Sequence, residues 1–123
     1  MAAFLSDDVL DDGLQVLTDD ANILHICSAQ PADFAGIAAV TLGNKATPTV
    51  GAPTNGTTSG RKVVVSAITD GTVTATDTAT HWALADSVGS RLLAAQALSS
   101  PQAVTDENTF TLDAIDIEIP DPA

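Results

Sequence analysis

The sequence predicts a mainly β protein, an antiparallel β-sandwich or barrel-like domain of about six strands with one N-terminal α-helix. Three apolar runs, residues 80–85, 91–98 and 110–119, follow one another with turn-like residues between them, which is typical of an antiparallel meander. Apolar residues make up 45% of the chain but aromatic residues only 3%, so the core is expected to consist of Val, Ile, Leu and Ala. The 123 residues have the length of one domain, which we expect to span residues 1–123.

Residues 1–20 are predicted to contain the helix. Ser6 can act as its N-cap, and Asp7 and Asp8 fall in the first turn, where the helix dipole favours acidic side chains. Gly13 weakens the helix by about 1 kcal/mol relative to Ala, which does not reverse the prediction. Apolar residues recur at helical spacing and are expected to form one buried stripe, which consists of Leu10, Leu14 and Leu17 with Val9 and Val16 beside them.

The chain after the helix is predicted to form a strand and then a long loop region. Residues 23–28 are apolar on both faces, which favours a central or covered strand. Residues 30–60 contain recurrent Pro, Gly, Thr and Asn, so they are predicted to be a loop and contact region. Within it we expect a short helical turn near residues 33–39 and an extended piece around residues 46–52.

Residues 61–119 are predicted to form an antiparallel meander. Its first hairpin joins residues 61–68 to residues 72–77, because Thr-Asp-Gly at 69–71 is a turn signal. In the last run the apolar positions change parity, from Phe110, Leu112 and Ala114 to Ile115, Ile117 and Ile119. Side chains along a strand alternate with a period of two, so we predict a β-bulge, or a bend where the strand changes the layer it packs on, near residues 113–116.

Charge and cysteine content exclude several classes of function. Sixteen Asp and Glu against four Lys and Arg give a net charge of -12, which argues against binding of nucleic acid or of an anionic membrane surface. The carboxylates are expected to form a solvated face, and a basic partner surface or divalent cations are the alternatives. No apolar run is long enough for a bilayer, and the first eight residues lack the basic region of a signal peptide. Cys27 stands alone, so no internal disulfide is possible.

Each candidate for chemistry has a simpler structural interpretation. His25 and Cys27 lie two residues apart on a predicted strand and could begin a metal site, but a buried strand explains them as well. His81 beside Trp82 could be a catalytic or binding pair, although Trp is more often a core residue. Gly89-Ser90 lies in a predicted hairpin turn, outside any G-x-S-x-G motif. We therefore predict no catalytic, cofactor-binding or metal-binding residues, no cofactor, and a protein that is not an enzyme.

Two further groups of residues are candidates for ligand binding that also have a structural interpretation. The acidic pairs at 7–8, 11–12 and 19–20 lack the spacing of a calcium loop, so solvation is the expected role. Residues 56–61 are rich in Gly but have no P-loop Lys and follow no predicted strand.

The order of segments along the chain resembles that of small structural proteins from tailed bacteriophages and prophages. The resemblance covers nearly the whole chain and rests on FLSD at 4–7, LHICSAQP at 24–31, LGNK at 42–45, VSAITDGTV at 65–73, ATHWALAD at 79–86, SRLLA at 90–94 and FTL at 110–112. These motifs are structural, and none of them supplies a site residue.

The resemblance implies a virion protein made in the host cytoplasm, and within that class a capsid decoration (cement) protein on the capsid surface. Such a protein binds the major capsid protein and stabilises the head shell as a homo-oligomer, with a trimer favoured. Residues 30–60 and the N-terminal residues are expected to make these contacts. A tail or head-to-tail connector component, a receptor-recognising tail module and a small hydrolase using His25 or His81 are the alternatives.

Overall fold

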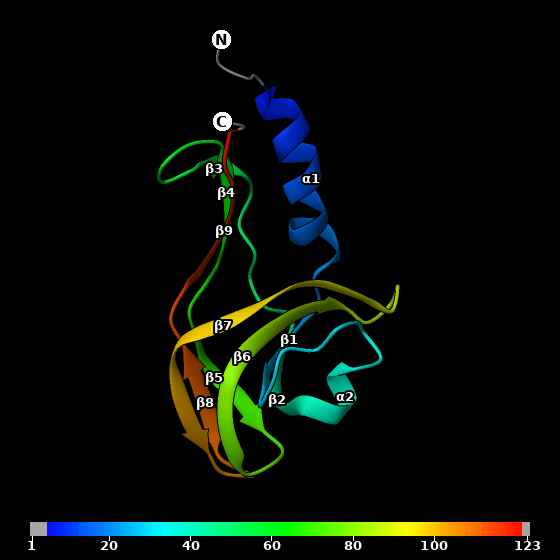
Figure 1. Cartoon of the computed structure of the whole chain (residues 1–123), viewed down its shortest axis with the longest axis vertical. Helices are drawn as coiled ribbons and strands as arrows, with labels where there is room; N and C mark the ends of the chain where they lie inside the picture. The colour runs from blue at the N-terminus through cyan, green and yellow to red at the C-terminus, as the bar shows by residue number, and fades with distance from the viewer. Residues whose placement is uncertain (1–4, 122–123) are drawn as a thin grey trace. The chain divides into compact units, whose positions relative to one another are not determined.

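The computed structural model describes residues 5–121, and its fold is mainly β with antiparallel sheets and one N-terminal helix, as predicted (Figure 1). The chain forms two compact units, each built from separate stretches. The first, here called the helical unit, contains residues 5–20, 49–67 and 113–121 of the described chain, and the second, the sheet unit, contains residues 21–48 and 68–112. That residues 1–123 fold as one domain stays a prediction.

The helical unit consists of a helix and a small sheet. Helix α1 (Asp7–Asp20) packs against β4 (Arg61–Val65), which lies between β3 (Thr54–Asn55) and β9 (Ile115–Ile119). The Ser6 hydroxyl oxygen accepts a hydrogen bond from the Asp8 amide at 3.2 Å, so the predicted N-cap is confirmed. The buried side chains of this unit are Leu10, Leu14, Leu17, Val63 and Val65.

The prediction of one buried stripe on α1 is only partly right. Leu10, Leu14 and Leu17 are buried, but Val9 and Val16 are exposed. On the helix, Val9 and Val16 lie about 100° around from the centre of the three leucines, so β4 covers one half of the apolar face and leaves the other half uncovered.

Both basic residues of the helical unit pair with carboxylates of neighbouring elements. Arg61 on β4 binds Asp11 on α1, with 2.7 Å between Nε and Oδ1, and this hydrogen bond raises the pKa of the guanidinium. Lys62 on β4 binds Asp116 on β9, with 3.1 Å between Nζ and Oδ2. These contacts hold the helix and β9 to the central strand of the small sheet.

The sheet unit is a six-stranded antiparallel sheet in the order β7-β6-β1-β2-β5-β8. The strands are β1 (Ile23–Cys27), β2 (Thr41–Ala46), β5 (Ile68–Val73), β6 (Asp77–Asp86), β7 (Arg91–Val104) and β8 (Thr109–Leu112), and the short helix α2 (Ile37–Val40) precedes β2. The predicted central strand at 23–28 is confirmed, since β1 pairs with β2 on one side and β6 on the other. The core of the sheet unit includes Leu24, Ile26, Cys27, Val73, Trp82, Ala83, Leu84 and Phe110.

The prediction of a loop over residues 30–60 is wrong for Thr41–Ala46, which form the inner strand β2. Its sequence, TLGNKA, lacks the β-branched and alternating apolar pattern of a strand, and pairing on both sides holds it in place. At Gly43 a Cβ would collide with the backbone of Thr72, so this glycine permits the close approach of β5. The expected helical turn near 33–39 corresponds to α2.

The predicted hairpin between residues 61–68 and 72–77 is also wrong, and residues 61–119 are not one meander. Residues 69–71 lie inside β5, which pairs with β2 and β8, whereas β4 pairs with β3 and β9 in the other sheet. Gly71 serves packing instead of a turn, because a Cβ there would collide with the ring of Phe110 on β8. Tertiary contact has overridden a local turn signal.

The predicted interruption near residues 113–116 is confirmed. Strand β8 ends at Leu112 in the six-stranded sheet, and β9 begins at Ile115 in the three-stranded sheet. The change of parity at residues 114 and 115 therefore marks a change of sheet.

Candidate functional site

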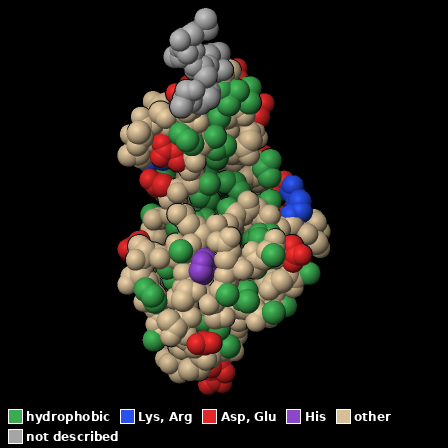
Figure 2. Space-filling model, in the orientation of Figure 1, with side chains coloured by type: hydrophobic (Ala, Val, Ile, Leu, Met, Phe, Trp, Pro, Cys, Tyr) green, Lys and Arg blue, Asp and Glu red, His purple; other side chains and the backbone are tan. Residues whose placement is uncertain are grey.

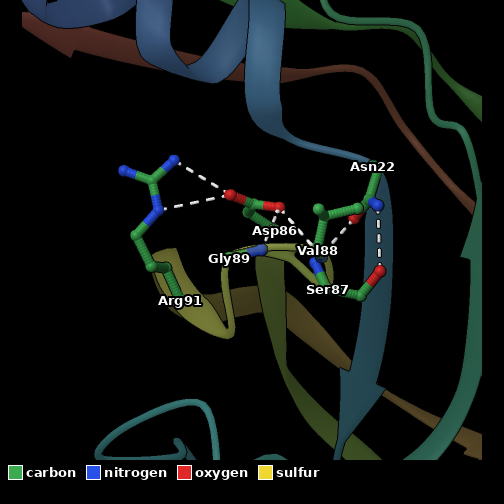
Figure 3. A network of polar contacts seen from close by, with 6 residues as sticks. All are labelled: Asn22, Asp86, Ser87, Val88, Gly89 and Arg91. Carbon is green, nitrogen blue, oxygen red and sulfur yellow. Dashed lines mark hydrogen bonds and ion pairs between the residues drawn. The ribbon is translucent and has the colours of Figure 1, made fainter.

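The turn between β6 and β7 is held by a network of polar contacts around Asp86 (Figure 3). The buried Asp86 carboxylate accepts hydrogen bonds from the backbone amides of Val88 and Gly89, both at 3.0 Å. Its other oxygen accepts from Arg91 Nη2 at 2.9 Å. The hydrogen bond from Gly89 and that from Arg91 lower the pKa of Asp86, so the carboxylate stays ionised.

A second pair of hydrogen bonds fixes the same turn to Asn22, the residue before β1. The Asn22 side-chain amide donates to Ser87 Oγ and accepts from the Ser87 backbone amide, both at 2.9 Å. Val88, at the tip, is 89% exposed. The turn thus exposes the apolar side chain of Val88 on a backbone that is fixed by hydrogen bonds.

The sequence pattern predicts a turn here but does not indicate the role of Asp86. Gly89-Ser90 lies in that turn, as predicted, and Gly89 is required because a Cβ would come within 2.6 Å of the Asp86 carboxylate. The sequence feature that indicates this role is an acidic residue directly before a turn, followed five residues later by Arg. Such a carboxylate can accept hydrogen bonds from the backbone amides of the turn.

The structure brings His25, Cys27 and His81 to the same region of the six-stranded sheet. Cys27 on β1 is the register partner of His81 on β6, and His25 lies two residues from Cys27. Each histidine Nδ1 is within hydrogen-bonding distance of a threonine hydroxyl, Thr41 at 2.9 Å for His25 and Thr80 at 2.8 Å for His81. Within residues 5–121, no group of three or more His, Cys, Asp and Glu side chains is arranged to hold a metal ion.

Burial determines the protonation of these groups. Burial raises the pKa of the Cys27 thiol to about 11, which opposes thiolate chemistry at neutral pH. Burial also lowers the pKa of His25, so this imidazole is neutral in the folded protein at neutral pH. Trp82, next to His81, is a buried core residue, which agrees with its structural interpretation.

Replacing His25 with Gln is expected to flatten the pH dependence of stability below pH 6.5, the ordinary pKa of histidine. Because the folded-state pKa is lowered, the unfolded chain binds the proton first as pH falls, and stability is lost from that pH downward to the folded-state pKa. The loss cannot exceed about 1.4 kcal/mol per pH unit for one proton. Urea unfolding at several pH values between 8 and 5 measures it, with His81→Gln as the matched control. An unchanged slope in His25→Gln would contradict the assignment.

An apolar surface remains uncovered on the helical unit. Val9 and Val16 lie on one side of α1 and are 55% and 36% exposed. Leu5 precedes the Ser6 N-cap of the helix and is 37% exposed. Ile119 on β9 is 37% exposed, and its Cδ1 lies 4.0 Å from the Cβ position of Gly13. We call these four side chains, Leu5, Val9, Val16 and Ile119, the α1 apolar surface.

Carboxylates flank the α1 apolar surface on one side of the helix. Asp8, Asp12 and Asp19 are exposed on the same helix, and Glu118 precedes Ile119 on β9. Figure 2 shows apolar side chains reaching the surface beside acidic ones on the face in view. The helical spacing of the sequence predicts Val9 and Val16 in the buried stripe, so it does not indicate this surface.

Comparison of the chain with protein-family models, with curated proteins and with solved structures found no match. Among residues 5–121, no helix combines the length and the apolar composition needed to cross a membrane.

Proposed function

We propose that the protein is a non-enzymatic virion structural protein, a capsid decoration protein that binds and stabilises a phage head shell. The observation that carries the proposal is the α1 apolar surface, whose four side chains are each more than a third exposed. Clustered apolar side chains on a soluble protein are typical of interaction surfaces. Removing apolar area from water is favourable by roughly 25 cal/mol per Å², and the costs of association are subtracted from this gain.

The acidic rim indicates what the partner surface contains. Asp8, Asp12 and Asp19 would lie at the edge of the contact, where Lys or Arg of the major capsid protein can neutralise them. Binding to the assembled shell and not to free subunits then stabilises the shell by mass action. The N-terminal residues are predicted to make contacts, and this proposal places residues 5–16 in the contact. Residues 1–4 lie outside the described chain.

A receptor-recognising tail module is the second candidate, and Val88 favours it. This side chain is 89% exposed on a turn fixed by Asp86 and Asn22, and rigid loop tips are common in recognition. In that case the tip, and not the α1 apolar surface, would make the functional contact.

Replacing Val9 with Asp is expected to weaken binding to head shells at least about tenfold, a change of about 1.4 kcal/mol. The substitution puts a charge into an apolar contact that already has an acidic rim, and because Val9 is exposed the helix should still fold. The measurement is co-sedimentation of the purified protein with intact heads of the phage or prophage that encodes it. Circular dichroism checks the fold of the variant.

Val88→Asp is the matched control, an exposed valine changed in the same way on the other unit. It should leave shell binding within about twofold of the original. Cryo-electron microscopy of the particle then gives location and copy number: many copies over the shell support the proposal, and a few copies at the tail support the second candidate. Equal binding of Val9→Asp and the original protein would refute the role of the α1 apolar surface.

A further inference from the structure

The four sheet edges of the described chain differ in how well they are protected against pairing with another strand. Strand β3 has only two residues, β8 has four, and β9 carries Asp116 and Glu118. Asp106, Glu107 and Asp113 flank β8. Shortness and charge are the usual means by which proteins prevent unwanted edge pairing.

Strand β7 is neither short nor acidic, and its one proline, Pro101, lies near its C-terminal end. It has 14 residues and no carboxylate, and its one charged residue, Arg91, is held by Asp86. Every position except Val104 is at least partly accessible. In an antiparallel sheet, alternate residues of an edge strand direct their N–H and C=O groups away from the sheet, so β7 offers a row of unpaired backbone groups.

The part of β7 suited to pairing can be delimited. Register shifts lie opposite Leu84/Ala85 and opposite Ala79/His81, so residues 94–97 form the regular stretch between them. At the far end, Gln102 Nε2 donates to the Thr111 carbonyl oxygen of β8 at 3.3 Å, which occupies that part of the edge. The regular stretch contains Ala94, Ala95, Gln96 and Ala97, whose small or flexible side chains allow another backbone to approach.

We propose that the β7 edge pairs with the β7 edge of a second copy of this chain, in antiparallel orientation about a two-fold axis. The charge distribution favours a second copy at this place. A chain with sixteen carboxylates and four basic residues repels itself over most of its surface, but residues 87–105 contain no carboxylate. A strand that pairs antiparallel with itself forms a closed dimer, in contrast to the trimer favoured by the resemblance.

Symmetry restricts the register. Directly opposed residues have side chains on the same face of the sheet, so residues of the same parity face each other. The two-fold axis therefore passes between one residue and the same residue of the other copy. Within residues 94–97, the central choices are Ala95 and Gln96. With the axis at Ala95, Leu92 lies opposite Leu98 of the other copy. Neither an axis at Ala95 nor one at Gln96 brings like charges together.

The experiment measures the mass of the purified protein by sedimentation equilibrium over a range of concentrations. The expected species has twice the 12.4 kDa mass of the chain. Gln96→Lys and Gln96→Glu place like charges near the axis, so each is expected to weaken the dimer at least about tenfold. An equimolar mixture of the two variants is expected to dimerise again, because the charges are then opposite.

Thr111→Lys is the control, since it adds a charge to the β8 edge and should leave the dimer intact. Gln96 is exposed, so its variants are expected to fold, which circular dichroism verifies. A monomer up to about 100 μM, a trimer, or a dimer that neither Gln96 variant weakens would overturn the proposal. No shell is present in this experiment, so its outcome is independent of the proposed function.

Discussion

Replacing Trp82 with Ala is expected to lower the free energy of unfolding by about 3–5 kcal/mol. Trp82 is 4% exposed and lies on β6, opposite Ile26 of β1 and Gln96 of β7. Removing the indole leaves a cavity, because a packed core relaxes only partly around a deleted side chain. A loss of this size is a large part of the roughly 5–15 kcal/mol by which a typical domain is stable.

Urea unfolding followed by far-UV circular dichroism measures this loss. Tryptophan fluorescence is unsuitable because Trp82 is the only tryptophan. His81→Ala is the matched control, since His81 is the half-buried neighbour on the same strand, and its loss should stay below about 1 kcal/mol. A similar loss in both variants would show that Trp82 is not a core residue.

Replacing Gly43 with Ala is expected to cost about 1–3 kcal/mol or more through overpacking. The added Cβ would collide with the Thr72 carbonyl oxygen and approach Val73 Cα, and both are backbone atoms that cannot rotate away. Only two register pairs join β2 to β5 in the described sheet, Gly43 with Val73 and Asn44 with Thr72. Separation at this point would loosen β5 and β8 together.

Amide hydrogen exchange tests this prediction at the level of strands. In Gly43→Ala, the amides of β5 and β8 are expected to lose protection before those of β1 and β6. Gly51→Ala is the control, because its Cβ would lie 3.6 Å from the Val64 carbonyl oxygen, an ordinary contact. Uniform exchange across all six strands would contradict a local effect.

Patterns with a regular period were sufficient to predict α1 and the break between β8 and β9. The three buried leucines repeat with the period of a helix, and the parity change at residue 115 requires an interruption of the strand, either a bulge or a change of layer. Strand β2 and the inner part of β5 could not be predicted, because their glycines look like turn residues. Gly43 and Gly71 are there for contacts with residues 29 and 39 positions away in sequence, Thr72 and Phe110.

The candidate surface was harder to predict for a related reason. The helical period shows that α1 has a wide apolar side, but it cannot show that β4 covers Leu10 and leaves Val9 exposed. The β7 edge depends on strand order, which the meander pattern gives only for neighbours in sequence such as β6 and β7. Which strand ends a sheet is set by long-range pairing.

The discontinuous make-up of the two units has a consequence for synthesis on the ribosome. All six strands of the sheet unit have been made once residue 112 has emerged, whereas the three-stranded sheet needs β9, which ends at Ile119. The N-terminal helix is translated first, but its strand partner β4 is flanked on both sides only after β9 has been synthesised. Early termination in residues 113–119 would remove Ile119 from the α1 apolar surface while sparing the β7 edge.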